Sequence, residues 1–99
     1  TMFFASCSIE VGCDSMIAPN CYVVDANHAI SKTSLIRESG LNVEPIWIGE
    51  DCWIGSGVTI IAGVRIGSGS IIGANSLVVN DIPEGAIAAG NPARVVGWR

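Results

Sequence analysis

Aliphatic side chains recur at every sixth position through the second half of this 99-residue chain. Counting in sixes from residue 48 gives Ile48, Ile54, Ile60, Ile66, Ile72 and Val78. Four of these six are followed by glycine, and the residue two positions before each is aliphatic or small. A period of six fits neither the 3.6-residue repeat of a helix nor the alternation of one long strand. Repetition at this period predicts a solenoid, and six-residue units are typical of a parallel β-helix.

Each unit is expected to supply one short strand and one corner of that solenoid. Residues two apart lie on the same side of a strand, so the repeated aliphatic residue and the residue two before it should both point inward. Three units close a triangular coil, which predicts three stacked pairs: Ile48 on Ile66, Ile54 on Ile72, and Ile60 on Val78. Glycine after the aliphatic residue should serve the corner, where a side chain would clash or demand an unfavourable φ.

The same period appears earlier at Val11, Ile17 and Val23, and it fails between residues 29 and 45. That interval carries four charged residues: Lys32, Arg37, Glu38 and Glu44. We therefore predict one all-β domain over residues 1–99, a parallel β-helix with a single protruding loop. Its expected parts are the first coils (1–28), the loop (about 29–45), regular coils (46–82) and a C-terminal segment (83–99). A loop that leaves a rigid scaffold is the expected substrate-facing element.

Composition narrows the possible partners. Hydrophobic residues make up 49% of the chain, more than a narrow prism can hide, which favours contacts between subunits. The net charge of −4, with only five Lys and Arg, disfavours nucleic acid and anionic membranes. We find no signal-like segment and no apolar run of about 18 residues, so we expect no membrane insertion. Four cysteines (Cys7, Cys13, Cys21 and Cys52) are then interpreted as reduced thiols of a cytoplasmic protein, with Cys21 and Cys52 facing inward.

The single histidine, His28, stands where the repeat breaks. An imidazole can take up a proton near neutral pH, and a general base works best when another group fixes its tautomer. Asp25 and Asn27 lie close enough in sequence to serve as that orienting group. From position alone, a catalytic base and an incidental histidine both remain open.

These features together resemble the hexapeptide-repeat acyltransferases, in particular the maltose, galactoside and polysaccharide O-acetyltransferases. The resemblance is carried by the repeats from Ile48 onward and by three further segments: Ile17-Ala18-Pro19-Asn20, Asp25-Ala26-Asn27-His28 and Ala88-Ala89-Gly90-Asn91-Pro92-Ala93-Arg94. It implies a left-handed β-helix, against the general rule for parallel crossovers, and a homotrimer with active sites between subunits. Relatives carry further coils upstream, so a short family member and a fragment of a longer enzyme both stay open.

The resemblance also implies a reaction. Acetyl-CoA would be the co-substrate, a sugar or polysaccharide hydroxyl the acceptor, and no metal would be needed. His28 aligns with the family's catalytic histidine and would deprotonate the acceptor for direct attack on the thioester. A backbone N–H matching Ser56 would stabilise the oxyanion of the tetrahedral intermediate.

Further cofactor-binding candidates follow from the same resemblance. Ser56 and Ala74 are eighteen residues apart, so they should line one straight groove for the pantetheine arm of CoA. The position of Trp53 matches a residue that lines the active site. Gly90 and Asn91 would border the CoA end of the groove. Arg94 would reach the CoA phosphates with its guanidinium group. Trp47 has no such match, and we interpret it as a subunit contact.

Three alternatives share the expected fold. An N-acyltransferase acting on an amino-sugar or amino acid would need the same histidine. A zinc hydratase of the γ-carbonic-anhydrase type would need three histidines, whereas this chain has one. A non-catalytic binding or structural β-helix would be indifferent to the loss of His28.

Overall fold

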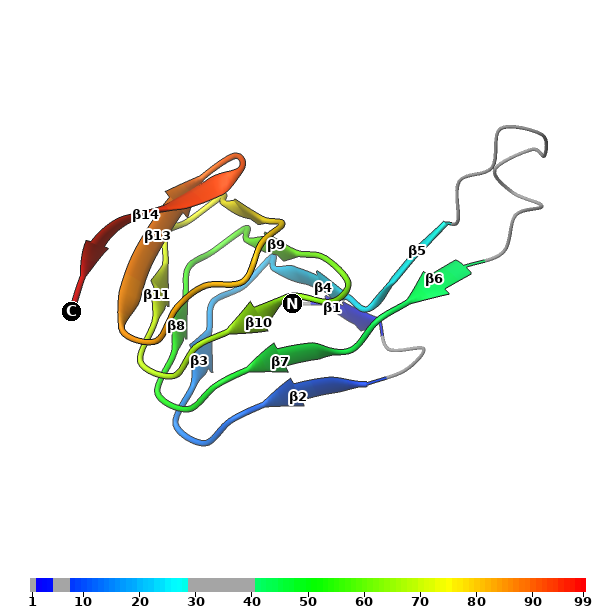
Figure 1. The fold of residues 1–99 in the computed structure, drawn as a ribbon, viewed down its shortest axis with the longest axis horizontal. Helices are drawn as coiled ribbons and strands as arrows, with labels where there is room; N and C mark the ends of the chain where they lie inside the picture. The colour runs from blue at the N-terminus through cyan, green and yellow to red at the C-terminus, as the bar shows by residue number, and fades with distance from the viewer. Residues whose placement is uncertain (1, 5–7, 29–40) are drawn as a thin grey trace.

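Short strands wound into a three-walled prism make up the protein in a computed structural model that describes residues 2–4, 8–28 and 41–99 (Figure 1). The first face is formed by β2 (Ile9–Val11), β7 (Ile46–Ile48) and β10 (Arg65–Ile66). The second face is formed by β3 (Met16–Ile17), β8 (Trp53–Ile54), β11 (Ile71–Ile72), β13 (Ala86–Gly90) and β14 (Ala93–Trp98). The third face is formed by β1 (Met2–Phe4), β4 (Tyr22–Val24), β9 (Thr59–Ile60) and β12 (Leu77–Val78).

Pairing between coils is parallel on all three faces, except that β14 runs antiparallel to β13 at the C-terminal edge. Followed from β2 through β3 and β4 to β7 in Figure 1, the coils wind left-handed. The predicted all-β, left-handed parallel β-helix is therefore confirmed. Among the described residues, no helix is long and apolar enough to cross a membrane.

The predicted stacking of inward side chains is also confirmed. The three expected pairs occur in register, and all six side chains are fully buried: Ile48 with Ile66, Ile54 with Ile72, and Ile60 with Val78. β-branched side chains suit these stacked walls because they pack well on a pleated surface. The walls form the hydrophobic core of the prism, so the six-residue period sets its cross-section.

Small inward residues two positions earlier complete the core at the corners. Cys21 and Cys52 are buried there as free thiols, as expected from the period. Ser70 and Ser76 are also buried, and each hydroxyl donates to a backbone carbonyl, of Pro83 at 2.9 Å and Gly73 at 2.7 Å respectively. A buried hydroxyl is costly unless it is hydrogen-bonded, so these corner carbonyls are what make serine acceptable in the core.

The corners correct one part of the expectation for glycine. Glycine directly after the aliphatic residue is needed for close approach: a Cβ on Gly55 would lie 2.7 Å from the Ala74 nitrogen of the next coil. The left-handed φ, however, is adopted two positions after this close-approach position, at Gly57 in the case of Gly55. It is adopted at eight corners by Asp14, Asn20, Asp51, Gly57, Gly63, Gly69, Asn75 and Gly85. Gly, Asn and Asp are the residues that tolerate this φ, so the corner signal was present in the sequence.

A β-hairpin stem leaves the prism where the period fails. β5 (Ala26–His28) pairs antiparallel with β6 (Leu41–Val43), and both project away from the walls on the side opposite β13 and β14 (Figure 1). The stem begins at residue 26, three residues before the expected start of the loop. Residues 29–40, the larger part of the expected 29–45 loop, lie outside the described residues.

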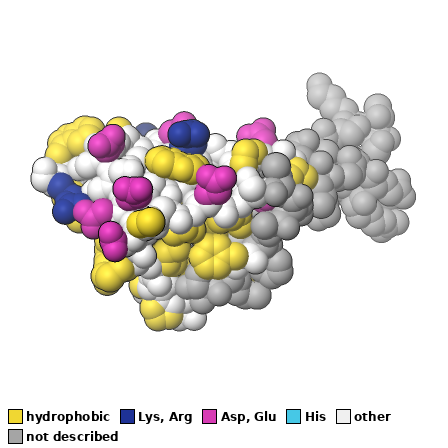
Figure 2. All heavy atoms as spheres, turned by 90° about the horizontal axis from the view of Figure 1, so that it is seen from below, with side chains coloured by type: hydrophobic (Ala, Val, Ile, Leu, Met, Phe, Trp, Pro, Cys, Tyr) yellow, Lys and Arg dark blue, Asp and Glu magenta, His cyan; other side chains and the backbone are white. Residues whose placement is uncertain are grey.

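Large hydrophobic side chains remain exposed on the single chain, as the composition predicted. They are Phe3, Val11, Met16, Tyr22, Val43, Trp53, Val95, Val96 and Trp98. Figure 2 shows exposed hydrophobic side chains beside several acidic ones on one side of the molecule. A prism this narrow has too little interior to hide them, so they are surfaces available for contact.

Candidate functional site

One edge of the prism, between the second and third faces, has a glycine followed by a small residue on each of two successive coils: Gly55-Ser56 and Gly73-Ala74. We call it the second corner; it comprises residues 18–21, 55–58 and 73–76. Gly55 approaches Ala74 so closely that a Cβ on Gly55 would also lie 3.0 Å from the Ala74 Cα. Ser56 and Ala74 therefore occupy equivalent, exposed positions on consecutive coils. This confirms the stacking that their spacing of eighteen predicted.

Two exposed residues of this corner have backbone N–H groups without an acceptor among the described residues. The Ser56 hydroxyl donates to the Pro19 carbonyl at 2.8 Å, and the Ser56 carbonyl accepts from the Asn75 N–H at 2.8 Å. The Ser56 and Ala74 N–H groups themselves make no hydrogen bond to any described residue. An exposed N–H without a protein acceptor is the kind of donor that can bind a developing oxyanion or a ligand carbonyl.

The turn between β13 and β14 lies at the C-terminal end of the second corner. Ala89 packs over Gly73, and the Gly90 N–H donates to the Ser76 hydroxyl at 3.1 Å. Arg94 pairs across the two strands with Ala89, and its side chain is exposed. The turn between them, Asn91 and Pro92, is exposed as well. The structure thus brings Gly90, Asn91 and Arg94 to the C-terminal end of the second corner, where all three residues are exposed.

Trp53 lies outward on the second face, in the strand that leads into the second corner. It is flanked in register by Met16 and Ile71 and is 45% exposed. Its ring also borders a hollow of about 250 Å³ that contains the Arg99–Asp51 ion pair. Trp53 is therefore an exposed aromatic surface beside the second corner rather than a core residue.

His28 is carried by a different edge, between the third and first faces, which we call the third corner. It is the last residue of β5, opposite Leu41, and Asn27 is opposite Asn42. The side chains of His28 and Asn27 lie outside the description, so their catalytic and orienting roles remain predictions. Asp25 is fully buried at the base of the hairpin, where its carbonyl accepts the Glu44 N–H at 2.9 Å.

Within one chain, the hairpin and the second corner are separated by the whole width of the third face. β4 runs from the second corner to the third corner, and the hairpin then leaves on the side opposite β13 and β14 (Figure 1). The predicted base and the predicted cofactor-binding residues thus form two separate groups in the single chain.

Similar proteins have this arrangement of repeats. Residues 45–80 match the family described as bacterial transferase hexapeptide (six repeats). A candidate acetyltransferase of Dictyostelium discoideum is 41% identical over 96 residues, which are 96% of this chain and 50% of that protein. A galactoside acetyltransferase in complex with coenzyme A superposes with a TM-score of 0.84 at 41% identity, covering 91% of this chain and 44% of that chain. A maltose O-acetyltransferase from Clostridium difficile 630 superposes with a TM-score of 0.83 at 40% identity, covering 97% and 55%.

Over nearly its whole length, this chain is similar to hexapeptide-repeat acetyltransferases. It spans about half the length of the relatives above. The described residues of this chain include the second corner and the backbone of the hairpin stem that carries His28.

The sequence also held a site that we did not predict. Arg65 follows Trp47 by eighteen residues, and the structure pairs them in register on the first face. The Arg65 guanidinium lies 4.8 Å from the centroid of the Trp47 ring. The eighteen-residue spacing was the available signal, because it places any two outward residues side by side on consecutive coils.

Proposed function

We propose that this chain is the catalytic β-helix of an acetyltransferase that uses acetyl-CoA to acetylate a hydroxyl group of a sugar or polysaccharide. The chain is proposed to act as a homotrimer in which the hairpin of one subunit meets the second corner of the next. The separation of the two groups at opposite ends of the third face carries this proposal. Threefold symmetry with the third face toward the axis would bring each third corner beside a neighbour's second corner.

The exposed residues support that assembly. The third face presents Tyr22, Thr59 and Leu77 outward, with no charged side chain among these three strand residues. The first face presents Glu10, Trp47 and Arg65 at the equivalent positions. Interface cores are depleted in charged residues, so the third face is the better candidate for burial near the axis.

The proposed reaction needs one base and one oxyanion donor. The imidazole of His28 takes the proton of the acceptor hydroxyl while the hydroxyl oxygen attacks the thioester carbonyl carbon. The Ser56 N–H donates to the resulting oxyanion, for which a positioned donor typically contributes about 3–4 kcal/mol. When the carbon–sulfur bond breaks, the imidazolium returns its proton to the departing thiolate. Small residues at Ser56 and Ala74 leave room for an extended arm, and Arg94 supplies a cation for phosphate.

Complementation between two inactive variants tests both the site and its position. His28→Ala should lower acetyl transfer by about 10²- to 10⁴-fold, the usual scale for a positioned base. Ala74→Trp should block the groove and lower transfer as well. Each variant lacks a different half of the proposed site. Mixed and reassembled trimers should then recover about one quarter of the wild-type sites, because one pairing in four joins an intact His28 to an intact groove.

The readout is thiol release from acetyl-CoA with sugar and amino-sugar acceptors. Recovery of activity in the mixture supports a site between subunits, and a mixture as inactive as its parts contradicts it. Full activity of His28→Ala alone would remove the proposed base. Transfer only to amino groups would replace O-acetylation by N-acylation on the same site.

A further inference from the structure

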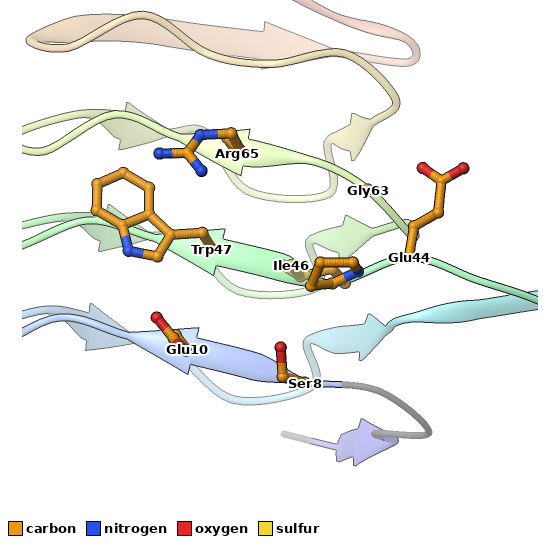
Figure 3. Close-up of a pocket in the computed structure, with 8 residues that line it drawn as sticks. Ser8, Glu10, Glu44, Ile46, Trp47, Gly63 and Arg65 are labelled. Atoms are coloured by element: carbon orange, nitrogen blue, oxygen red, sulfur yellow. The ribbon is translucent and has the colours of Figure 1, made fainter.

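A ladder of three unlike side chains crosses the first face of the prism. Glu10 on β2, Trp47 on β7 and Arg65 on β10 occupy matched positions on three successive coils. Figure 3 shows them projecting from neighbouring strands, with the Arg65 guanidinium beside the Trp47 ring. The 4.8 Å contact between them is a cation–π interaction, which holds both groups in a fixed relation.

A hollow of about 410 Å³ opens beside this ladder. Its lining residues are Ser8, Glu10, Glu44, Pro45, Ile46, Trp47, Gly63 and Arg65. A second hollow, of about 530 Å³, lies along β10 and shares Trp47 and Arg65 with the first. Both volumes lie within the range of roughly 300–1,000 Å³ that is typical of small-molecule sites. Together they form a shallow groove along the first face.

The glycine in this lining keeps the first hollow open. Gly63 has a φ of +80°, and a Cβ at that position would collide with the Glu44 carboxylate. The carboxylate of Glu44 therefore lies against bare backbone at the third corner, at the edge of the hollow (Figure 3).

The charged side chains that line the first hollow do not form ion pairs with one another. In the described part of the chain, neither the Glu10 and Glu44 carboxylates nor the Arg65 guanidinium forms an ion pair or a side-chain hydrogen bond. Two carboxylates disfavour an anion here, and the guanidinium disfavours a cation. A neutral ligand with many hydroxyl groups suits this mixture, because carboxylates accept from hydroxyls and the guanidinium donates to them.

The aromatic ring adds a second criterion. Trp47 is half-buried, so part of its indole stays available to a ligand. The C–H face of a pyranose ring is flat and apolar, and it can pack on an indole by dispersion while its hydroxyls point to polar groups around it. An aromatic platform surrounded by unpaired donors and acceptors therefore fits a sugar ring.

The hollow lies at the base of the hairpin that carries His28. Glu44 directly follows β6, and its N–H donates to the Asp25 carbonyl before β5 begins. His28 is three residues beyond Asp25, which is roughly 10 Å at the rise of a β-strand. The second corner of the same chain lies across the prism, on the edge opposite the first face.

We propose that this hollow is a non-catalytic subsite that binds one pyranose unit of a polymeric acceptor, about 10 Å from the hydroxyl to be acetylated. The role as an acceptor subsite rests on the proposed function. Binding of sugar by Trp47, Arg65 and Glu44 rests only on the geometry of the first face. A long acceptor would thereby be held by the same subunit that supplies His28.

Binding is measured by NMR on the chain without acetyl-CoA, using maltohexaose and a linear β-1,4-galactohexaose as probes. At least one hexasaccharide should shift the Trp47 indole N–H, with a dissociation constant on the order of millimolar, which corresponds to about −4 kcal/mol. Trp47→Ala should weaken that binding about tenfold or more, a loss of about 1.4 kcal/mol. Trp98→Ala removes an exposed indole that lines neither hollow and is the matched control, expected to change binding less than about twofold.

Two further variants separate recognition from a folding defect. Trp47→Phe keeps an aromatic platform and should retain most of the binding that Trp47→Ala loses. Glu44→Gln keeps the size of the side chain and should weaken binding, since it removes a charge-assisted acceptor. The hollow is not a sugar site if neither hexasaccharide moves the Trp47 signal, or if Trp47→Ala and Trp98→Ala behave alike. A smaller assembly of Trp47→Ala in sedimentation would identify Trp47 as a subunit contact and overturn the inference.

Kinetics then separate this inference from the proposed function. With a hexasaccharide acceptor, Trp47→Ala should raise KM about tenfold and leave kcat nearly unchanged, whereas with a monosaccharide both should match wild type. Sugar binding without any acetyl transfer would remove the proposed function and leave the binding site. Transfer that is insensitive to acceptor length and to Trp47 would remove the acceptor subsite alone.

Discussion

The second and third corners of the prism are built from the same six-residue unit, yet only the second is repeated without interruption. At the second corner, small residues stack coil after coil, from Ala18 through Gly55 and Gly73 to Ala89. At the third corner, the first coil opens after Asp25 into the β5–β6 hairpin. The prism nevertheless closes around the insertion, because Val23 still pairs in register with Ile60.

This difference shows which residues determine the scaffold. Val11, Ile17 and Val23 each pair with the residue 37 positions later, whereas Ile48, Ile54 and Ile60 pair with the residue eighteen positions later. The inward side chains tolerate this change because their stacking depends on the paired strands and not on the length of chain that connects them. A corner can therefore be extended into a hairpin without disturbing the core, and unusual side chains can be added there.

The largest expected effect on stability comes from truncating a buried side chain in a wall of the prism. Ile66→Ala removes a fully buried side chain stacked on Ile48, and we expect a loss of about 2–5 kcal/mol in the free energy of unfolding. Val43→Ala on the hairpin, where the side chain is 39% exposed, is the control and should cost less than about 1 kcal/mol. Urea denaturation measures both. Equal losses would show that the hairpin contributes to the core as much as the walls do.

A smaller loss is expected from a methyl group at the second corner. In Gly55→Ala the new Cβ would lie 2.7 Å from the Ala74 nitrogen and 2.9 Å from the Ile72 oxygen, both of them backbone atoms. The two coils must separate, which we expect to cost about 1–3 kcal/mol. Gly97→Ala is the matched control, because its nearest atom is the end of the Ile87 side chain at 3.9 Å. If the two alanines have the same effect on thermal unfolding, close approach does not govern the second corner.

Much of the scaffold could be predicted from the sequence because its hydrophobic pattern is periodic. The register of Ile48 on Ile66 follows from counting, and burial of Cys52 follows from its place two residues before Ile54. The hairpin stem was harder to predict from the sequence. Ala26–His28 continues the strand pattern of the coil, and only its antiparallel pairing with Leu41–Val43 shows that the chain leaves the prism there. That pairing depends on a partner thirteen or more residues away, which no local pattern encodes.

The candidate site was predictable to a lesser degree. Ser56 and Ala74 follow from the spacing, but their usefulness as N–H donors depends on which backbone groups the neighbouring coil leaves unbonded. The Trp47–Arg65 pair had the same spacing and was missed, because a tryptophan and an arginine do not belong to the hydrophobic pattern. A prediction based only on the period of the inward residues therefore misses residues that point outward.

A still smaller effect should follow from losing one buried hydroxyl near the C-terminal end of the second corner. Ser76 donates to the Gly73 carbonyl and accepts from the Gly90 N–H. Ser76→Ala leaves the Gly90 N–H without that acceptor, but Gly90 is exposed and water can replace it, so we expect a loss of about 1 kcal/mol. Hydrogen exchange should show faster exchange at Gly90 than at Gly73, whose N–H donates to the Ala88 carbonyl. Unchanged protection of Gly90 would contradict this role.

The smallest expected effect concerns the ion pair between Arg99 and Asp51, in which Nη1 of Arg99 lies 3.0 Å from Oδ2 of Asp51. Both side chains are largely exposed, at 48% and 67%, so Asp51→Asn should cost no more than about 0.2–1 kcal/mol, and less in high salt. Asparagine tolerates the φ of +54° at this corner, so the substitution tests charge rather than backbone strain. Asp14→Asn is the matched control, since Asp14 has a similar φ of +62° and borders the same hollow without pairing with Arg99. Thermal unfolding at low and high salt should separate the two variants only at low salt. A salt-independent difference would show that Asp51 stabilises its corner through backbone contacts. The edge between the first and second faces, where Asp51 lies, would then depend on local conformation as much as the second corner does.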